Sequence, residues 1–332
     1  MAQSQSFVTK VPLVLAHKID RLQYFLSNPL WLVMRQVCKF KLGRMLYRIG
    51  IPKTTDIPTS RNTSASVFEA VPTVTSVVEA LKQDGMCGGF QLAPSVVEEI
   101  VQFAKSTPCY GDRRKQLGFY YDDREKAEQL ANRAFAIGHF WNVPVMCSTV
   151  DRIRQDPALL AIAAHYLQGT PVHQGSQMWW TFAKPNTEAP LKSKGDAGQE
   201  FHYDLDDSYS VKFFFFLTDV DANSGAHVYV QGSHRWKQLR HQWKREGIPE
   251  AELMRTYGDD AVITVEGKAG LGFVEDTACF HRGIPSRSRD RLLLTVQYAL
   301  RDYKMQSSIV QPASLSLVPG YRPEARLLSL QR

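Results

Sequence analysis

The sequence predicts a mainly β protein with flanking helices, on three observations. Between about residues 172 and 300 the chain carries apolar, partly β-branched runs that are typical of core strands. Upstream segments predict a strand and a helix within about 86–106 and further helices near 123–138 and 150–168. The composition, 44% hydrophobic and 22% charged over 332 residues, is that of an ordinary globular chain.

The chain divides into three predicted parts. Residues 1–52 form a basic, amphipathic helical extension, and residues 53–74, which are rich in Thr, Ser and Pro, form a linker. Residues 75–332 form a single domain whose β core spans about 172–300. The tail from Asp302 contains three prolines and is expected to be irregular.

The net charge is concentrated in the extension. Residues 1–53 contain nine Lys or Arg and one acid, Asp20, whereas the whole chain has a net charge of +7. A stripe at helical spacing runs along the extension, formed by Trp31, Met34, Cys38, Leu42, Met45 and Ile49. Basic residues beside such a stripe suit a helix lying on an anionic membrane through residues 28–53. A helix docked on the core with its charges in water is the open alternative.

The composition also limits the cell compartment and the classes of binding partner that we expect. The five cysteines are odd in number and lack a CxxC pattern, which argues against a disulfide framework or zinc site and favours a reducing compartment. We therefore expect a cytoplasmic protein, peripheral on the inner face of a membrane if the extension binds lipid. The basic residues lack a nucleic-acid-binding motif, and no partner protein is indicated.

The segment His202-Tyr203-Asp204 is the most informative feature of the core. It lies in a short extended segment, where residues i and i+2 point to the same side, so both side chains would enter one cavity. Together with a distant His, this pair forms a ligand set that binds one face of Fe(II) and leaves the other open. The alternative is a surface turn with a solvated Asp, because the composition alone predicts about half an accidental His-x-Asp.

His281 is the best third ligand. It follows a short predicted strand and a polar break, and it precedes the apolar core strand that begins at Arg291. His234, in a turn, is the rival ligand, for which we expect a structural role. His227 is expected to be a hydrogen-bonded core His.

Arg291 stands at the start of that core strand. Burying a guanidinium there costs free energy unless an anion pairs with it. Its planar set of N–H donors can form two parallel hydrogen bonds to a carboxylate. We interpret it as a clamp for the distal carboxylate of a 2-oxoacid. The alternative is an Arg at a strand end that points to water.

Several segments together resemble the successive blocks of the phytanoyl-CoA dioxygenase family, and weaker similarity extends the resemblance to roughly residues 75–300. The blocks are Phe201-His-Tyr-Asp204, Asp219-Val-Asp-Ala-Asn-Ser-Gly225, Gln231-Gly-Ser-His-Arg-Trp236, His281-Arg-Gly-Ile-Pro285 and Arg291. The resemblance implies Fe(II), 2-oxoglutarate and O2 as cofactors. It assigns His202, Asp204 and His281 to iron, and Arg291 to the distal carboxylate of 2-oxoglutarate. Strands that carry such ligands imply a double-stranded β-helix, of the jelly-roll or cupin-like type.

Two departures from the family pattern stand out. Gly283 replaces a small hydroxyl residue that often assists the arginine, so a second anchor of 2-oxoglutarate stays unassigned. Gln231 replaces a proline and is read as a turn variant. We predict that Trp180 contacts 2-oxoglutarate and that Trp179 and Asp206 contact the substrate. The alternatives are ordinary core packing for the two tryptophans and a solvated carboxylate for Asp206.

The expected reaction is hydroxylation of an unactivated C–H bond of a small or lipid-linked substrate, with release of succinate and CO2. It requires no catalytic residues beyond the iron ligands, because the metal and cosubstrate carry the hard step. Two alternatives stay open. One is a cupin-like metal-binding protein without oxygenase activity, and the other is a peripheral membrane protein that acts through its basic N-terminal helix.

Overall fold

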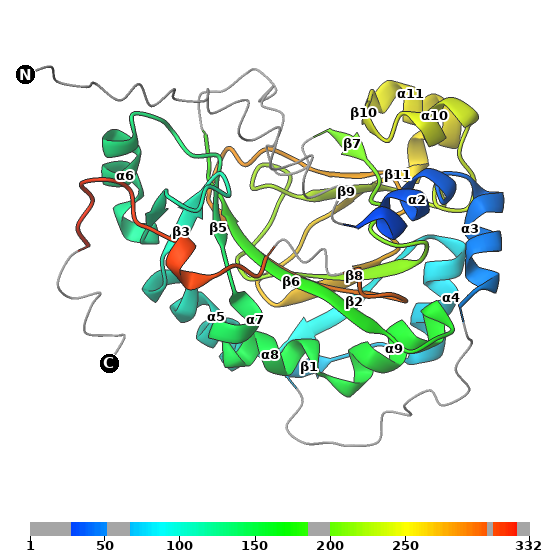
Figure 1. The fold of residues 1–332 in the computed structure, drawn as a ribbon, viewed down its shortest axis with the longest axis horizontal. Helices are drawn as coiled ribbons and strands as arrows, with labels where there is room; N and C mark the ends of the chain where they lie inside the picture. Colours follow the sequence, from blue (N-terminus) through cyan, green and yellow to red (C-terminus); the bar gives the residue numbers. More distant parts are fainter. Residues whose placement is uncertain (1–27, 52–66, 185–199, 304–307, 324–332) are drawn as a thin grey trace, which may run out of the picture.

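Two antiparallel sheets face each other in the computed structural model, which describes residues 28–51, 67–184, 200–303 and 308–323 (Figure 1). The larger sheet has nine strands and the smaller has five. Helices cover the outer face of the larger sheet, and the smaller sheet lies over its inner face. The prediction of a mainly β core with flanking helices is therefore confirmed.

The first six strands all belong to the larger sheet, and the later strands are divided between the two sheets. The larger sheet, in spatial order, contains β1 (Phe68–Ala70), β2 (Met86–Leu92), β12 (Leu271–Glu275), β8 (Ser210–Phe216), β14 (Arg291–Ala299), β6 (Val172–Thr181), β5 (Ile137–Phe140), β3 (Cys109–Gly111) and β4 (Gly118–Phe119). The smaller sheet contains β10 (Glu246–Ile248), β7 (Phe201–His202), β13 (His281–Gly283), β9 (His227–Val230) and β11 (Val262–Val265).

The helices are short and lie mostly before the core. They are α2 (Pro29–Val37), α3 (Lys41–Ile49), α4 (Val74–Gln83), α5 (Pro94–Ser106), α6 (Arg124–Ala131), α7 (Val143–Met146), α8 (Ser148–Arg154), α9 (Pro157–Leu167), α10 (Leu239–Trp243) and α11 (Glu250–Tyr257). Three single 3₁₀ turns are η1 (Tyr121–Asp123), η2 (Asp259–Ala261) and η3 (Pro312–Ser314). Within the described residues no helix combines the length and apolar character needed to cross a bilayer.

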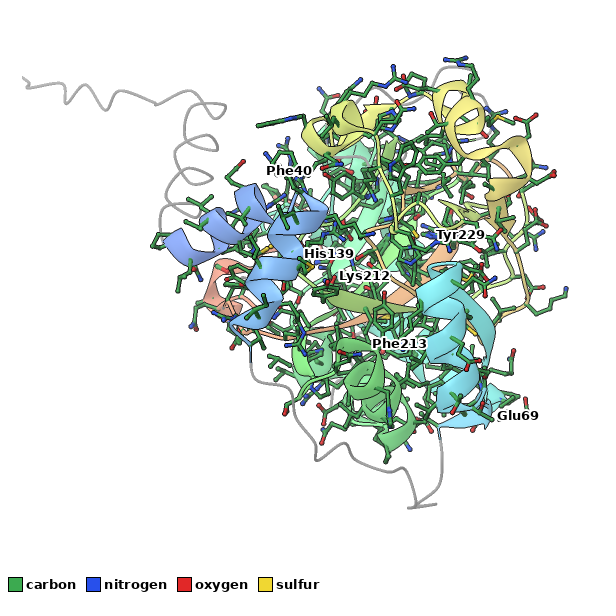
Figure 2. All side chains as sticks on the ribbon, turned by 90° about the vertical axis from the view of Figure 1, so that its right-hand side faces the viewer. Phe40, Glu69, His139, Lys212, Phe213 and Tyr229 are labelled. Atoms are coloured by element: carbon green, nitrogen blue, oxygen red, sulfur yellow. The ribbon has the colours of Figure 1, made fainter. Side chains whose placement is uncertain are left out.

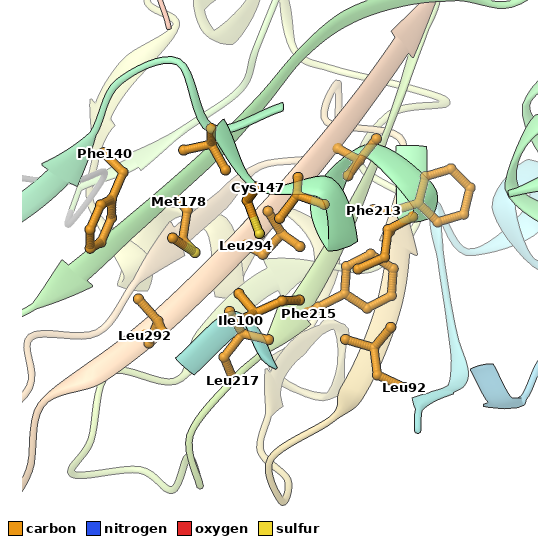
Figure 3. Close-up of a cluster of buried hydrophobic side chains, with 14 of the residues drawn as sticks. Leu92, Ile100, Phe140, Cys147, Met178, Phe213, Phe215, Leu217, Leu292 and Leu294 are labelled. Atoms are coloured by element: carbon orange, nitrogen blue, oxygen red, sulfur yellow. The ribbon is translucent and has the colours of Figure 1, made fainter. Parts of the chain in front are cut away.

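The central strands are buried on both faces, and their alternation separates two environments. On β8, Phe213 and Phe215 point to the helices and join the main hydrophobic core, as do Leu292 and Leu294 of β14 (Figure 3). The intervening residues, such as Phe214 on β8, point to the inner face. Because successive side chains of a strand alternate, the inner face carries a separate set of residues that is free for chemistry.

Element boundaries differ from the sequence prediction in three places. The helix expected over 123–138 ends at Ala131, because Asn132 adopts a left-handed conformation (φ 49°), and a strand follows from Ile137. The helix expected over 150–168 is divided at Asp156, which caps the second helix. The described part of the linker contains β1, which pairs with β2, so the sheet begins before residue 75.

The described part of the extension, residues 28–51, forms two helices rather than one, and its apolar stripe is divided. Trp31, Met34 and Cys38 are buried against the core, in a cluster that includes Leu205 and Tyr303. The remaining stripe residues, on α3, are exposed: Leu42 at 62%, Met45 at 54% and Ile49 at 75%. A single apolar face along residues 28–53 was therefore a wrong prediction, because the helix is interrupted between Val37 and Lys41.

Asp207 ties the loop after β7 to the end of β14, and we expect Asp207→Asn to destabilise the fold. One carboxylate oxygen accepts from the backbone N–H groups of Leu300 and Arg301, at 2.9 and 3.0 Å, and the other from Ser208 N at 2.6 Å. An amide turns one acceptor into a donor that faces N–H groups, so stability should fall by about 3 kcal/mol. Thermal unfolding should show a Tm lower by about 10 °C. Asp219→Asn, at a partly exposed carboxylate, should change Tm by less than about 3 °C; an equal drop in both variants would contradict this role.

Candidate metal centre

His202, Asp204 and His281 converge on one point between the sheets. One ligand atom from each lies within 4.8 Å of the others. The Nε2 atoms of His202 and His281 each lie 3.9 Å from an oxygen of Asp204, and the two imidazole rings are 4.4 Å apart. The cause is strand pairing, because His202 on β7 stands opposite His281 on β13. Asp204 lies just past β7 rather than within it, but it still turns to the same side.

Both histidines present the same ring nitrogen to the centre. Nδ1 of His202 lies 2.8 Å from the carbonyl of Glu200, and Nδ1 of His281 lies 3.0 Å from the carbonyl of Cys279. A carbonyl can only accept, so each Nδ1 carries the proton. Each Nε2 therefore keeps a free lone pair that points toward the cluster, which is the arrangement a metal-binding histidine needs.

Asp204 is held in its ionised form. Burial alone would raise the pKa of this carboxyl, but Lys212 and the two imidazoles hold it well below its ordinary range. Lys212, on the inner face of β8, donates to Oδ2 of Asp204 at 2.6 Å. The pKa of Lys212 is in turn raised, since the charge of Asp204 outweighs the cost of burial. The site thus contains a fixed carboxylate at neutral pH, with Lys212 orienting one of its oxygens.

Glu275 and His227 form a layer behind His281. Glu275, at the end of β12, is hydrogen-bonded to Nε2 of His227 at 2.7 Å, and its other oxygen lies 3.4 Å from Nδ1 of His281. Burial raises the pKa of Glu275 to about 8, and it lowers the pKa of His227 to about 3 and that of His281 to about 4. His281 is therefore neutral at pH 7 and can bind a metal without first losing a proton.

Replacing Glu275 should weaken the metal centre through the orientation of His281. We expect Glu275→Ala to lower Fe(II) affinity by about 10- to 100-fold, because it removes the group that packs behind the imidazole. Glu275→Gln keeps the shape and one hydrogen bond, and it should cost less than about tenfold. Anaerobic competition with a chromophoric chelator measures both affinities. Equal losses in the two variants would show that the carboxyl group itself, rather than the packing of the side chain behind His281, matters.

Arg291 lies beside this centre, buried and without an anionic partner among the described residues. Its guanidinium donates to the carbonyl of Gly225 and, at 3.0 Å, to the hydroxyl of Thr181, while Nε has no partner. Burial lowers the pKa of Arg291 to about 10, so it stays charged at neutral pH. Gly225, to which Arg291 is hydrogen-bonded, lies just before β9. His227 on that strand stacks on His281 with ring centroids 5.6 Å apart, and this connects Arg291 to the metal centre. A buried, charged donor this close to the metal ligands is suited to a carboxylate.

The two tryptophans of β6 lie on opposite faces, and this corrects the assignment of Trp180. Trp180 packs in the main core on the helix side and stacks on Tyr121 with ring centroids 4.1 Å apart. Thr181 pairs with Arg291, and Trp179 packs with the inner-face cluster, so these residues share the inner face. Trp180 therefore points away from the site, and Trp179 is the tryptophan on the side of the metal centre.

Asp206 is held within the protein. Its carboxylate accepts from the amide of Gln297 at 3.1 Å, and its backbone carbonyl accepts from Trp31 Nε1 at 3.1 Å. The expectation of a freely solvated loop carboxylate is therefore wrong, and a contact with substrate stays a prediction.

The rival histidines are placed as the sequence predicted. His234 lies outside the cluster, with Nδ1 3.3 Å from Cys279 Sγ and Nε2 3.2 Å from the Lys82 carbonyl. His227 is a buried, hydrogen-bonded histidine. Three residues that support the site were not predicted from the sequence: Thr181, Lys212 and Glu275. Strand register places Thr181 opposite Arg291 and Lys212 on the inner face. Register between distant strands cannot be predicted from one sequence, so no local pattern could have identified them.

Comparisons with known proteins place the chain in context. The sequence model of the family described as phytanoyl-CoA dioxygenase (PhyH) matches residues 81–292. A search of curated proteins found no significant match. Similar solved structures include the non-heme α-ketoglutarate-dependent epimerase SnoN from nogalamycin biosynthesis, with 15% identity over 68% of this chain and 82% of that chain (TM-score 0.42).

Two further structures are similar at the same level. AviO1 from Streptomyces viridochromogenes Tue57 is 15% identical over 71% of this chain and 96% of that chain (TM-score 0.42). HygX from Streptomyces hygroscopicus, determined with nickel, 2-oxoglutarate and hygromycin B, is 15% identical over 68% of this chain and 86% of that chain (TM-score 0.44). The family match extends over more than half of the chain and includes His202, Asp204, His281 and Arg291.

Proposed function

Because this chain belongs to the phytanoyl-CoA dioxygenase family, whose cofactors are Fe(II), 2-oxoglutarate and O2, we propose that it hydroxylates an unactivated C–H bond of a small or lipid-linked substrate. Succinate and CO2 would be the products of the cosubstrate. One observation carries the proposal: a buried arginine without an anion lies beside a His-Asp-His cluster. Arg291 has no anionic partner among the described residues, and together with the cluster it suits a metal and a 2-oxoacid.

The donor set fits Fe(II). Two neutral imidazoles and one ionised carboxylate are the ligands of mononuclear iron sites that keep open positions for chemistry. His202, Asp204 and His281 would hold the metal. The carbonyls of Glu200 and Cys279 fix the ring orientation of the two histidines, which lowers the cost of organising the site.

Arg291 and Thr181 fit the distal carboxylate of 2-oxoglutarate. The unpartnered Nε of Arg291 supplies a free donor, and the Thr181 hydroxyl lies 3.0 Å from the guanidinium. Thr181 would thus fill the role left open by Gly283. A charge-assisted pair inside the protein is stronger than one in water, so this anchor would contribute much of the cosubstrate's affinity.

The surrounding residues would orient and shield the reaction. Bound Fe(II), with 2-oxoglutarate and O2, supplies the oxidising power. Lys212 holds Asp204 in place, and Glu275 supports His281. Phe214 and Phe273 stack next to His227 and keep this side of the site apolar, which excludes water from a reactive centre. No general acid or base is needed.

We assign the opposed sheets to a double-stranded β-helix. Strands β7, β13 and β9 carry metal-centre residues on one sheet, while β8, β12 and β14 carry supporting residues on the other. The site would lie between the sheets, where side chains from both can meet.

Adding 2-oxoglutarate to anaerobic, Fe(II)-loaded protein tests the proposal. We expect a charge-transfer absorption band, and succinate once oxygen is admitted. If neither appears, the oxygenase assignment is wrong. The remaining candidate would then be a metal-binding protein without oxygenase activity. With a substrate found by screening for stimulated succinate release, hydroxylation predicts one atom of ¹⁸O from ¹⁸O2 in the product. Epimerisation or ring closure would add none.

A further inference from the structure

Exposed apolar side chains gather on one side of the molecule, outside the metal centre. Of the 14 large hydrophobic residues that are exposed among those described, ten belong to two segments. Seven lie on α2 and α3: Leu30, Val33, Val37, Leu42, Met45, Leu46 and Ile49. Three lie on and around α10: Trp236, Leu239 and Trp243. We call these ten residues the hairpin surface; such a concentration marks an interaction site.

Helix α3 is oriented opposite to an ordinary surface helix. Its apolar residues point outward, with Leu42, Met45, Leu46 and Ile49 between 54% and 75% exposed. Its two arginines point toward the protein, whereas Lys41 at its start is exposed. Arg44 donates to the Cys38 carbonyl at 2.9 Å, and Arg48 to the Gln168 carbonyl at 2.6 Å. A helix of a globular protein usually buries its apolar stripe, so this stripe is expected to meet an apolar partner.

Close packing fixes that orientation. A Cβ added at Gly43 of α3 would lie 2.0 Å from the carbonyl oxygen of Val37, so the two helices approach as closely as glycine permits. Tyr47 on the inner side shares a 2.8 Å hydrogen bond with Tyr303. Helix α2 is held by its buried residues Trp31 and Met34. The outward stripe is thus built into the hairpin.

The segments form one surface with a basic border. Phe40, between α2 and α3, packs edge to face on Trp243 at 5.3 Å, and Lys39 lies 5.5 Å from the same ring. Figure 1 shows the blue hairpin beside the yellow α10 segment, and Figure 2 places Phe40 where they meet. Residues 28–50 contain five Lys or Arg and residues 235–245 another five, and neither stretch contains an acid. Lys237 among them is buried and Arg240 pairs with Glu252, so the other basic residues supply the charge of the border. Burial, Arg245 and Arg35 all lower the pKa of Lys39, which reflects this density of positive charge.

We propose that the hairpin surface binds peripherally to an anionic lipid bilayer, with the stripe of α3 inserted at the level of the headgroups. An amphipathic helix with basic neighbours and a tryptophan at its edge is suited to that environment. A second copy of the chain is a poorer partner, because a symmetric contact would set basic residues against the same basic residues. Residues 1–27 and 52–66 carry net charges of +2 and +1, with one acid each, so their net charge does not complement this surface either.

The buried side of α2 connects the hairpin surface to the loop that follows Asp204. Leu205, which follows Asp204, packs against α2, and Trp31 donates to the carbonyl of Asp206. If the proposed function holds, a bilayer at this surface would present membrane-borne substrates near the site. Lipid binding itself requires neither iron nor 2-oxoglutarate, so its test is independent of the proposed function.

Vesicle co-sedimentation of the full chain tests the proposal. We expect binding to phosphatidylcholine vesicles that contain phosphatidylglycerol, and much weaker binding to phosphatidylcholine alone or at high salt. The triple variant Leu42→Ser, Met45→Ser and Ile49→Ser should bind at least about tenfold more weakly, because three inserted side chains are lost. Lys39→Gln with Lys41→Gln should remove most of the preference for anionic lipid.

The matched control is Val145→Ser with Met146→Ser, at exposed apolar residues of α7 (78% and 53% exposed), which should bind as the wild type does. The substituted α3 residues are exposed, so circular dichroism should show unchanged folding. Wild-type protein that ignores anionic vesicles, or a triple variant that binds them equally, would overturn the proposal. So would a wild-type dimer that the triple variant converts to monomer, without vesicle binding, since the surface would then be a self-association face.

Discussion

His281→Ala and His202→Ala should each abolish iron-dependent turnover. Each substitution removes one of three ligands, and the remaining pair cannot hold Fe(II) at ordinary concentrations. We expect succinate formation to fall by more than about 100-fold, with a matching loss of Fe(II) in equilibrium dialysis. Asp204→Asn should have the same effect. It is preferable to Asp204→Ala, which would leave Lys212 without a polar partner where Asp204 Oδ2 now lies at 2.6 Å.

His234→Ala is the matched control for these variants. This histidine is also near Cys279, but its ring contacts the Cys279 thiol and the Lys82 carbonyl rather than the cluster. It should keep Fe(II) binding within about threefold of the wild type. Loss of iron in His234→Ala with retention in His281→Ala would reverse the assignment of the third ligand.

Arg291→Gln should separate cosubstrate binding from metal binding. The variant loses the charge that would pair with the distal carboxylate of 2-oxoglutarate, but it leaves His202, Asp204 and His281 intact. A buried charge-assisted pair contributes about 3–4 kcal/mol, so the KM for 2-oxoglutarate should rise by about 100- to 1000-fold. Fe(II) affinity without 2-oxoglutarate should change little. The charge-transfer titration and the chelator competition measure the two quantities independently.

Two further variants serve as controls for the effect of Arg291→Gln on the KM for 2-oxoglutarate. Arg289→Gln removes a nearby arginine that is 50% exposed and paired with Asp221, and it should leave the KM near the wild-type value. Thr181→Val removes only the hydroxyl next to Arg291, and a rise of about tenfold is expected for one hydrogen bond. An unchanged KM in Arg291→Gln would show that this arginine is structural. A simultaneous loss of Fe(II) would show that it supports the metal centre instead.

Local sequence determined most elements and the candidate ligands. His202 and Asp204 are two residues apart, from which we predicted that they share one side of the chain. Asp204 lies just past the strand, but its side chain still meets that of His202 in the cluster. Arg291 begins a mostly apolar run, from which we predicted a buried guanidinium that needs an anion; the structure buries the whole strand, so Arg291 does not point to water. The course of the chain through 86–106 was also readable, because strand and helix patterns there are strong and local.

Only the tertiary structure decided which distant residues meet and which face each side chain takes. Trp179 and Trp180 are neighbours of similar chemistry, and the pairing of β6 with β14 alone assigns Trp179 to the side of Arg291. Strand register brings Thr181 and Lys212 to the site. Each lies opposite a residue of β14 that is about 80 to 110 positions away in the sequence, so the pairing cannot be read from local sequence. The stripe of the extension likewise revealed amphipathic helices, but a turn near Phe40 determined that half is buried and half faces outward. Periodicity is a local property of the chain, whereas the surface against which a face packs is set by the whole fold.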